Sequence, residues 1–347
     1  MKKLLLSLIA IALTATLCAQ AIYPAPEWKR ANPAKYGFDA EKLQAARQFV
    51  IDSTRTTGLM VVVGGEVIFQ YGCVRSNSRV ASVRKSILSM MFGKYIENGT
   101  INMSLTMADL GIDDVEGLLP IEKQATIAHL IASRSGVYHE ASNSGSDEVN
   151  RPARGTKQPG EFFLYNNWDF NAIGAIFEQL VGRDIYDVFQ DDIAIPIGMQ
   201  DYNVKDQRKS GDLTLSRFPA YHFYLSTRDK ARIGYLMLRE GKWGDTQVIS
   251  TPWVRESIRV VTPKSDALPA RPSRDLFGYS YMWWNFIVDN EPALEGAYTA
   301  WGWGGQYITI VPKLDMVISH KTDILFERRT SVEQYYDLLR MIVNAKK

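Results

Sequence analysis

Two residues with complementary chemistry, Ser82 and Lys85, stand three positions apart at the start of a segment with helical periodicity. The segment continues through ILSMMFGKYIENG, so a helix is predicted over about residues 82–98. Residues three apart share one face of a helix, which brings the amine within reach of the hydroxyl. A desolvated lysine can activate such a nucleophile, and free N–H groups at a helix N-terminus favour an oxyanion. Taken alone, however, this common spacing favours a capping serine and a solvated lysine.

A second group, Tyr165-Asn166-Asn167, lies in a turn directly before a helix that is predicted to begin at about Trp168. There a phenol and a carboxamide could point into a cleft. Without a nucleophile elsewhere, the simpler interpretation is that Asn167 caps the helix and Tyr165 packs its ring. Together with Ser82, the group predicts that hydroxyl, amine and phenol converge in one pocket.

The third group is the run WGWGGQ, residues 301–306, which leads into the strand pattern YITIVP. Glycines at the edge of a strand allow a ligand to approach the backbone closely, and a strand N–H beside the nucleophile could be a second oxyanion donor. The same run also describes a tight turn with two buried indoles. Both interpretations can hold together.

Histidine and metal chemistry are less well supported. The sequence has no G-x-S-x-G motif, and Ser135 and His139, although close in sequence, lie in a predicted loop. No H-E-x-x-H motif or His/Cys cluster is present, and Asp113-Asp114 lacks the calcium-loop pattern. The sequence therefore predicts neither a metal nor another cofactor. The four histidines are His129, His139, His222 and His320.

The amino terminus, MKKLLLSLIAIALTATLCAQA, has two lysines, an apolar run and small residues, as in a cleaved export signal. We therefore expect residues 1–21 to be a signal peptide and the mature protein to be periplasmic or secreted. Lipid attachment at Cys18 is disfavoured because Leu17 is not the small residue that this processing needs. The apolar run is shorter than the roughly 20 residues of a membrane-spanning helix.

The composition describes an ordinary globular protein with one core. Without the two signal lysines, the 40 basic residues become 38, against 38 acidic residues. A formally neutral chain has no electrostatic preference for nucleic acid, so no nucleic-acid partner is expected. Cys73 is then the only cysteine of the mature chain, which excludes an internal disulfide.

The order of predicted elements indicates an α+β fold. A helix and a hairpin around Gly64-Gly65 come first, helices follow, and strands with a closing helix come last. This order predicts an antiparallel sheet that both chain ends complete, flanked by N- and C-terminal helices, with an inserted all-helical subdomain. The predicted strands near the end lie in FGYSYMWWNF, QYITIVP and DMVISHKTD, and the predicted helices cover about 40–53, 126–132, 168–181, 183–191, 227–240 and 331–344.

These motifs, in this order, resemble those of the β-lactamase-related serine hydrolases, which include the class C β-lactamases, penicillin-binding proteins, esterases and nylon-oligomer (6-aminohexanoate-dimer) hydrolases. The segments TIAHLIASRSGVY, IAIPIGMQDY and YLSTRDKARIGYLMLREGKW also resemble this family, so the similarity spans nearly the whole mature chain. It implies one β-lactamase/DD-peptidase-like domain over residues 22–347. The sheet part would be about 36–80 and 225–347, and the helical part about 81–224.

The resemblance also implies roles for individual residues. Ser82 would attack a carbonyl and form an acyl-enzyme. Lys85 and Tyr165 would share the serine proton and pass it to the leaving group, although the resemblance leaves open which of them accepts it. Asn167 would hydrogen-bond the substrate, and water would complete the hydrolysis without a metal.

The third motif departs from the family pattern. Lactamases and many carboxypeptidases begin this motif with Lys or His, whereas this chain has Trp303-Gly304-Gly305, or the register one residue earlier. The cation that would bind a substrate carboxylate is missing there, and the Trp-Gly-Gly form resembles the esterases. We therefore expect an ester or amide substrate that contacts Trp303, Gly304, Gly305 and Gln306, with a second oxyanion N–H near Gly305 or Gln306.

Two alternatives remain open at the level of sequence. The first is β-lactamase or D-Ala-D-Ala carboxypeptidase activity. The second is a non-catalytic periplasmic binding or sensor protein with the same fold, against which the intact Ser82, Lys85 and Tyr165 argue.

Overall fold

The sheet of this protein is built from both ends of the chain. The computed structural model describes residues 21–266 and 275–347, so the predicted signal peptide lies outside the described residues except for Ala21. The sheet is antiparallel throughout and has the strand order β2-β1-β13-β12-β11-β10-β9. Its strands are β1 (Gly58–Val63), β2 (Glu66–Gly72), β9 (Phe277–Tyr279), β10 (Trp284–Phe286), β11 (Tyr298–Gly302), β12 (Gln306–Val311) and β13 (Met316–Lys321).

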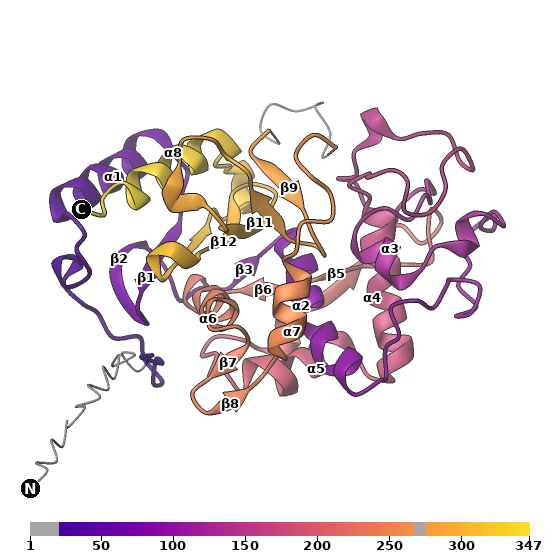
Figure 1. The fold of residues 1–347 in the computed structure, drawn as a ribbon, viewed down its shortest axis with the longest axis horizontal. Helices are drawn as coiled ribbons and strands as arrows, with labels where there is room; N and C mark the ends of the chain where they lie inside the picture. The colour runs from indigo at the N-terminus through magenta and orange to yellow at the C-terminus, as the bar shows by residue number, and fades with distance from the viewer. Residues whose placement is uncertain (1–20, 267–274) are drawn as a thin grey trace, which may run out of the picture.

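Helices cover both faces of the sheet (Figure 1). On one face, α1 (Ala40–Ser53) packs along α8 (Val332–Val343), where Tyr335 stacks on Tyr307 of β12 with ring centroids 3.6 Å apart. On the other face, α6 (Thr227–Leu238) lies against β1, β12 and β13. A Cβ on Gly234 would come within 2.5 Å of Val317, so only glycine permits this close approach.

Helices from the middle of the chain form the second part of the molecule, of which α3 (Ile127–Ile131) and α4 (Asn167–Val181) lie at the right of Figure 1. Its central helix, α2 (Val83–Glu97), contacts β11, α4 and α7, and buried residues occur on all sides of it, as expected for a helix in a core. The start of α2 therefore lies where the sheet and the helical part meet. The other helices of this part are α5 (Ile185–Phe189) and a π-helical turn (Gln190–Ala194). A later helix, α7 (Thr251–Ser257), packs on α2.

The α+β fold class is confirmed, and the hairpin at Gly64-Gly65 is present. Two details differ from the prediction. The segment FGYSYMWWNF is not one strand, because a turn at Ser280–Trp283, with Met282 at φ 62°, divides it into β9 and β10. The helical part is not wholly helical, since it includes the ribbon of β4 (Arg208–Ser210) and β5 (Ala220–His222).

The described structure contains two more short two-stranded ribbons. They are β3 (Ser78–Arg79) with β6 (Tyr224–Leu225), and β7 (Lys242–Trp243) with β8 (Thr246–Gln247). Among the residues that the structure describes, no helix is both long and apolar enough to cross a membrane.

Packing between α6 and the sheet can be tested at Ile308, which is fully buried and lies close to Gly234. We expect Ile308→Ala to lower the free energy of unfolding by about 2–4 kcal/mol, because it removes buried methyl groups and leaves a cavity. Ile195→Ala is the control, since Ile195 is 65% exposed, and should cost less than about 1 kcal/mol. Urea unfolding measures both variants, and equal losses would contradict this account of the core.

Candidate active site

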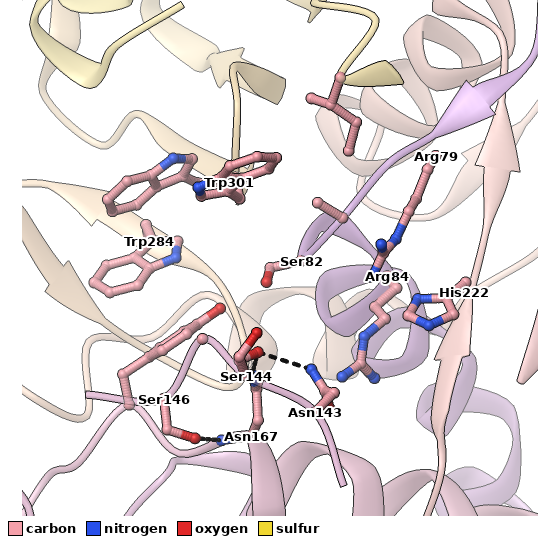
Figure 2. A pocket seen from close by; sticks show the side chains of 15 residues that line it. Arg79, Ser82, Arg84, Asn143, Ser144, Ser146, Asn167, His222, Trp284 and Trp301 are labelled. Atoms are coloured by element: carbon pink, nitrogen blue, oxygen red, sulfur yellow. Dashed lines mark hydrogen bonds between the residues drawn. The ribbon is translucent and has the colours of Figure 1, made fainter. Parts of the chain in front are cut away.

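Ser82 lies at the N-cap position of α2, but its side chain caps nothing. The preceding residue, Ala81, has φ 48°, a conformation that L-residues rarely adopt, and this turns the chain sharply into the helix. The Ser82 hydroxyl makes no capping bond and lines a cavity of about 440 Å³. Figure 2 shows it near the middle of this cavity. The interpretation as a capping serine is therefore wrong.

Lys85 lies one helical turn further and is only 2% exposed, so it is not a solvated lysine. Its Nζ donates to Tyr165 Oη at 2.6 Å and to Asn167 Oδ1 at 2.7 Å. The same nitrogen lies 4.0 Å from the centroid of the Tyr165 ring and 4.1 Å from that of Phe170. Amine and phenol thus meet beside the cavity that Ser82 lines, although they are 80 residues apart in sequence.

The loop before α4 orients the phenol and the carboxamide. Asn166, rather than Asn167, caps this helix by accepting from Trp168 N at 3.1 Å, which leaves the Asn167 side chain free to meet Lys85. The Asn167 Nδ2 donates to Ser144 O at 2.7 Å. The Tyr165 ring packs against Trp284, with centroids 5.5 Å apart.

One residue that the sequence analysis did not select, Asp169, supports this loop. Asp169 is buried and accepts hydrogen bonds from Ser135 Oγ at 2.6 Å and from Asn166 Nδ2 at 3.2 Å. Burial raises the pKa of the Asp169 carboxyl well above its ordinary value, and these hydrogen bonds oppose the rise. No motif marked Asp169, whose partner Ser135 lies 34 residues earlier in the chain.

The end of β11 lies directly against the nucleophile. A Cβ on Gly302 would come 2.4 Å from Val80 O and 3.0 Å from Ser82 N, so the two backbones touch only because residue 302 is glycine. By contrast, Gly305 faces Thr322 and Thr330, and Gln306 is fully buried, with its amide donating to Thr322 O. Gly302 is therefore the glycine of this run that approaches Ser82.

Only some of the predicted substrate-binding residues line the cavity. Asn167 and Trp303 do, whereas Gly304, Gly305 and Gln306 do not. Trp303 is 51% exposed and carries the Arg329 guanidinium over its ring at 4.4 Å. The complete lining is Arg79, Ala81, Ser82, Arg84, Asn143, Ser144, Gly145, Ser146, Tyr165, Asn167, His222, Trp284, Trp301, Trp303 and Ile324.

His139 and His320 are held by structural partners. His139 bonds the carbonyls of Glu140 and Val115 rather than Ser135. His320 is fully buried between Thr56 Oγ1 and Gly305 O. Within residues 21–266 and 275–347, no group of three His, Cys, Asp or Glu side chains is arranged to hold a metal ion.

The Beta-lactamase family model matches residues 44–323, and the chain belongs to that family. It is a β-lactamase-family hydrolase, and the members of this fold family are serine hydrolases. No curated protein sequence matches this chain.

Solved structures share the fold at low sequence identity. A candidate 6-aminohexanoate-dimer hydrolase from Bacillus anthracis has a TM-score of 0.67 and 17% identity, covering 92% of this chain and 87% of its own. EstCE1, a hydrolase with promiscuous acyltransferase activity, has a TM-score of 0.62 and 17% identity, covering 88% and 97%. A family VIII carboxylesterase has a TM-score of 0.62 and 13% identity, covering 89% and 99%.

The contact between Gly302 and Ser82 can be tested directly. We expect Gly302→Ala to lower kcat for ester hydrolysis at least about tenfold, because the added methyl group displaces β11 from the Ser82 N–H, and oxyanion donors act mainly on the transition state. Steady-state kinetics measure kcat, and thermal unfolding shows whether the variant is folded. A folded variant with unchanged kcat would contradict this role for the end of β11.

Burial of His320 predicts a pH dependence of stability. Burial lowers the pKa of His320 to about 3, while the unfolded chain titrates near the ordinary value of about 6.5. Below pH 6.5 the unfolded state therefore binds a proton that the folded state does not, so stability falls as the pH falls towards 3. This histidine contributes about 1.4 kcal/mol per pH unit. Urea unfolding at several pH values should show a shallower fall for His320→Gln, and an identical slope would contradict this assignment.

Proposed function

We propose that this protein is a secreted hydrolase that cleaves an ester or amide through an acyl-enzyme on Ser82. The observation that carries the proposal is the hydrogen bond between Lys85 Nζ and Tyr165 Oη beside the cavity that Ser82 lines. A buried lysine held by a phenol at the first turn of a helix is suited to take and return a proton. Export follows from the signal-like residues 1–21, and we expect the mature chain to lack them.

In the proposed first step, Ser82 Oγ attacks the substrate carbonyl carbon while the pair of Lys85 and Tyr165 takes the hydroxyl proton. The tetrahedral oxyanion is stabilised by the Ser82 N–H, which has no hydrogen-bond partner among the described residues, and by an N–H at the end of β11 near Gly302. The positive end of the α2 dipole adds to this stabilisation.

In the second step the C–O or C–N bond breaks, and the departing alcohol or amine receives the proton. Water then attacks the carbonyl carbon of the acyl-enzyme and gives its proton to the same pair. The bond between the acyl carbon and Ser82 Oγ breaks, Oγ receives that proton, and the carboxylic acid product leaves. Asn167 is placed to bind the substrate, because it lines the cavity and bonds to Lys85.

The absence of a cation from the third motif supports esters or amides over β-lactams and D-Ala-D-Ala peptides. Where those enzymes carry Lys or His, the run WGWGGQ supplies indoles and glycines. Trp301 and Trp284 line the cavity and provide an apolar wall for the substrate.

Removal of the nucleophile and of the base tests the mechanism. We expect Ser82→Ala to abolish hydrolysis of 4-nitrophenyl esters, because no acyl-enzyme can form. Lys85→Ala should lower kcat/KM at least about 10²-fold, the scale of lost general acid–base help. Lys94→Ala is the matched control, since Lys94 lies on the same helix but is paired with Asp192 at the surface. Initial rates and thermal unfolding are measured for each variant.

Near-normal rates in Lys85→Ala would refute the role of the lysine as the base. A fluorescent phosphonate, followed by intact-mass analysis, reports labelling of Ser82 independently of turnover. A permanent adduct with a substrate ester, without turnover, would instead identify a sensor protein. A chromogenic cephalosporin assayed beside the esters distinguishes β-lactamase activity.

A further inference from the structure

The cavity beside Ser82 has two chemically different sides (Figure 2). Trp284 and Trp301 lie on one side of the serine, and Arg79, Arg84 and His222 lie on the other. We call these last three residues the cationic wall. The proposed hydrolytic mechanism does not use them, and the sequence analysis did not select the arginines.

Arg84 is only 3% exposed, and only some of its hydrogen-bond donors have partners among the described residues. Its Nη2 donates to Asn171 Oδ1 at 2.6 Å, and its guanidinium stacks 4.3 Å from the centroid of the Tyr221 ring. These two contacts hold the guanidinium in place. Its Nη1 has no hydrogen-bond partner among the described residues. A buried, unsatisfied donor of a permanent cation requires an explanation, because such groups are rare and costly.

His222 has a similar unsatisfied atom. It is 5% exposed, its Nε2 lies 2.8 Å from Ser210 Oγ, and its Nδ1 has no partner within the described structure. Burial, together with the nearby arginines, lowers the pKa of His222 to about 3, so the ring is neutral near pH 7. With the Ser210 hydroxyl donating to Nε2, the ring nitrogen Nδ1 carries a hydrogen that it can donate.

The charge of the wall is not balanced within the protein. Across residues 21–266 and 275–347, no carboxylate forms an ion pair with Arg79 or Arg84. Glu178, on the same helix as Asn171, is paired with Lys209 instead. Arg79 is exposed and lines the cavity. Two cations and unused N–H donors beside the nucleophile therefore favour an anion.

We propose that the cationic wall binds a carboxylate of the substrate, so that the natural ester or amide carries a free carboxylate on one side of the scissile bond and an apolar group on the other. Arg84 Nη1 and His222 Nδ1 are the donors of this wall that lack a partner among the described residues. The inference rests on the proposed hydrolytic function and names its substrate class. In this proposal the arginines take the place of the cation that the third motif lacks, and they lie across Ser82 from the tryptophans (Figure 2).

The test uses two pairs of esters that differ only in one charge. Mono-(4-nitrophenyl) glutarate is compared with its methyl ester, which places the carboxylate in the acyl part. 4-Acetoxybenzoate is compared with its methyl ester, which places the carboxylate in the alcohol part. The measured quantity is the ratio of kcat/KM for the charged ester to that for the neutral ester.

We expect this ratio to exceed one in at least one pair and to fall about tenfold in Arg79→Gln, the scale of one charge-assisted hydrogen bond. Added salt should also lower it, because Arg79 is exposed. Arg47→Gln is the matched control, since it removes one positive charge from α1, outside the cavity. Ratios that do not change in Arg79→Gln, or that change equally in Arg47→Gln, would overturn the proposal.

Binding without turnover separates this proposal from the hydrolytic mechanism. Calorimetric titration of the Ser82→Ala variant with glutarate should give saturable binding that weakens about tenfold when Arg79→Gln is added. If wild-type protein hydrolyses no ester but glutarate binding behaves in this way, the hydrolytic function fails and the carboxylate site stands. If esters are hydrolysed but glutarate binding is absent or insensitive to Arg79, the carboxylate site fails alone.

Discussion

The burial of Lys85 is the constraint on which the site depends. An amine that is 2% exposed loses its hydration, and the protein replaces it with the oxygens of Tyr165 and Asn167 and with the faces of two aromatic rings. These partners lie about 80 residues after the lysine, in the loop before α4 and in the first turn of α4, so this region must fold onto α2 before the lysine is satisfied. The same contacts bring amine and phenol to the cavity that Ser82 lines.

Other residues hold Lys85 and its partners in place. Because buried residues occur on all sides of α2, its position is fixed both by the sheet through β11 and by α4. The capping of α4 by Asn166 directs the neighbouring carboxamide to the lysine, and the buried Asp169 holds Asn166 in turn. Gly302 lets the sheet approach the serine backbone. Each of these residues acts on the chemistry by fixing another residue.

The sequence was sufficient for the fold class, for most helices and for the convergence of Lys85 and Tyr165, because local periodicity and motif order carry this information. It was insufficient for β11, whose residues Tyr298–Gly302 show no clear alternation, and for the division of FGYSYMWWNF by a turn at Met282. Asp169 and the cationic wall were also missed. Their partners are distant in sequence. Local sequence does not show which arginine or aspartate becomes buried when the chain folds.

The pairing of β1 with β13 has a consequence for how the protein is made. Gly58 lies opposite Lys321 in this ladder, so almost the whole chain must be synthesised before the sheet can close. Contacts between such distant segments form slowly, since a large loop must first be closed. Until then β1 presents an unpaired edge that can associate with other chains. A nascent or prematurely terminated chain therefore contains the serine and the lysine but has no catalytic cavity.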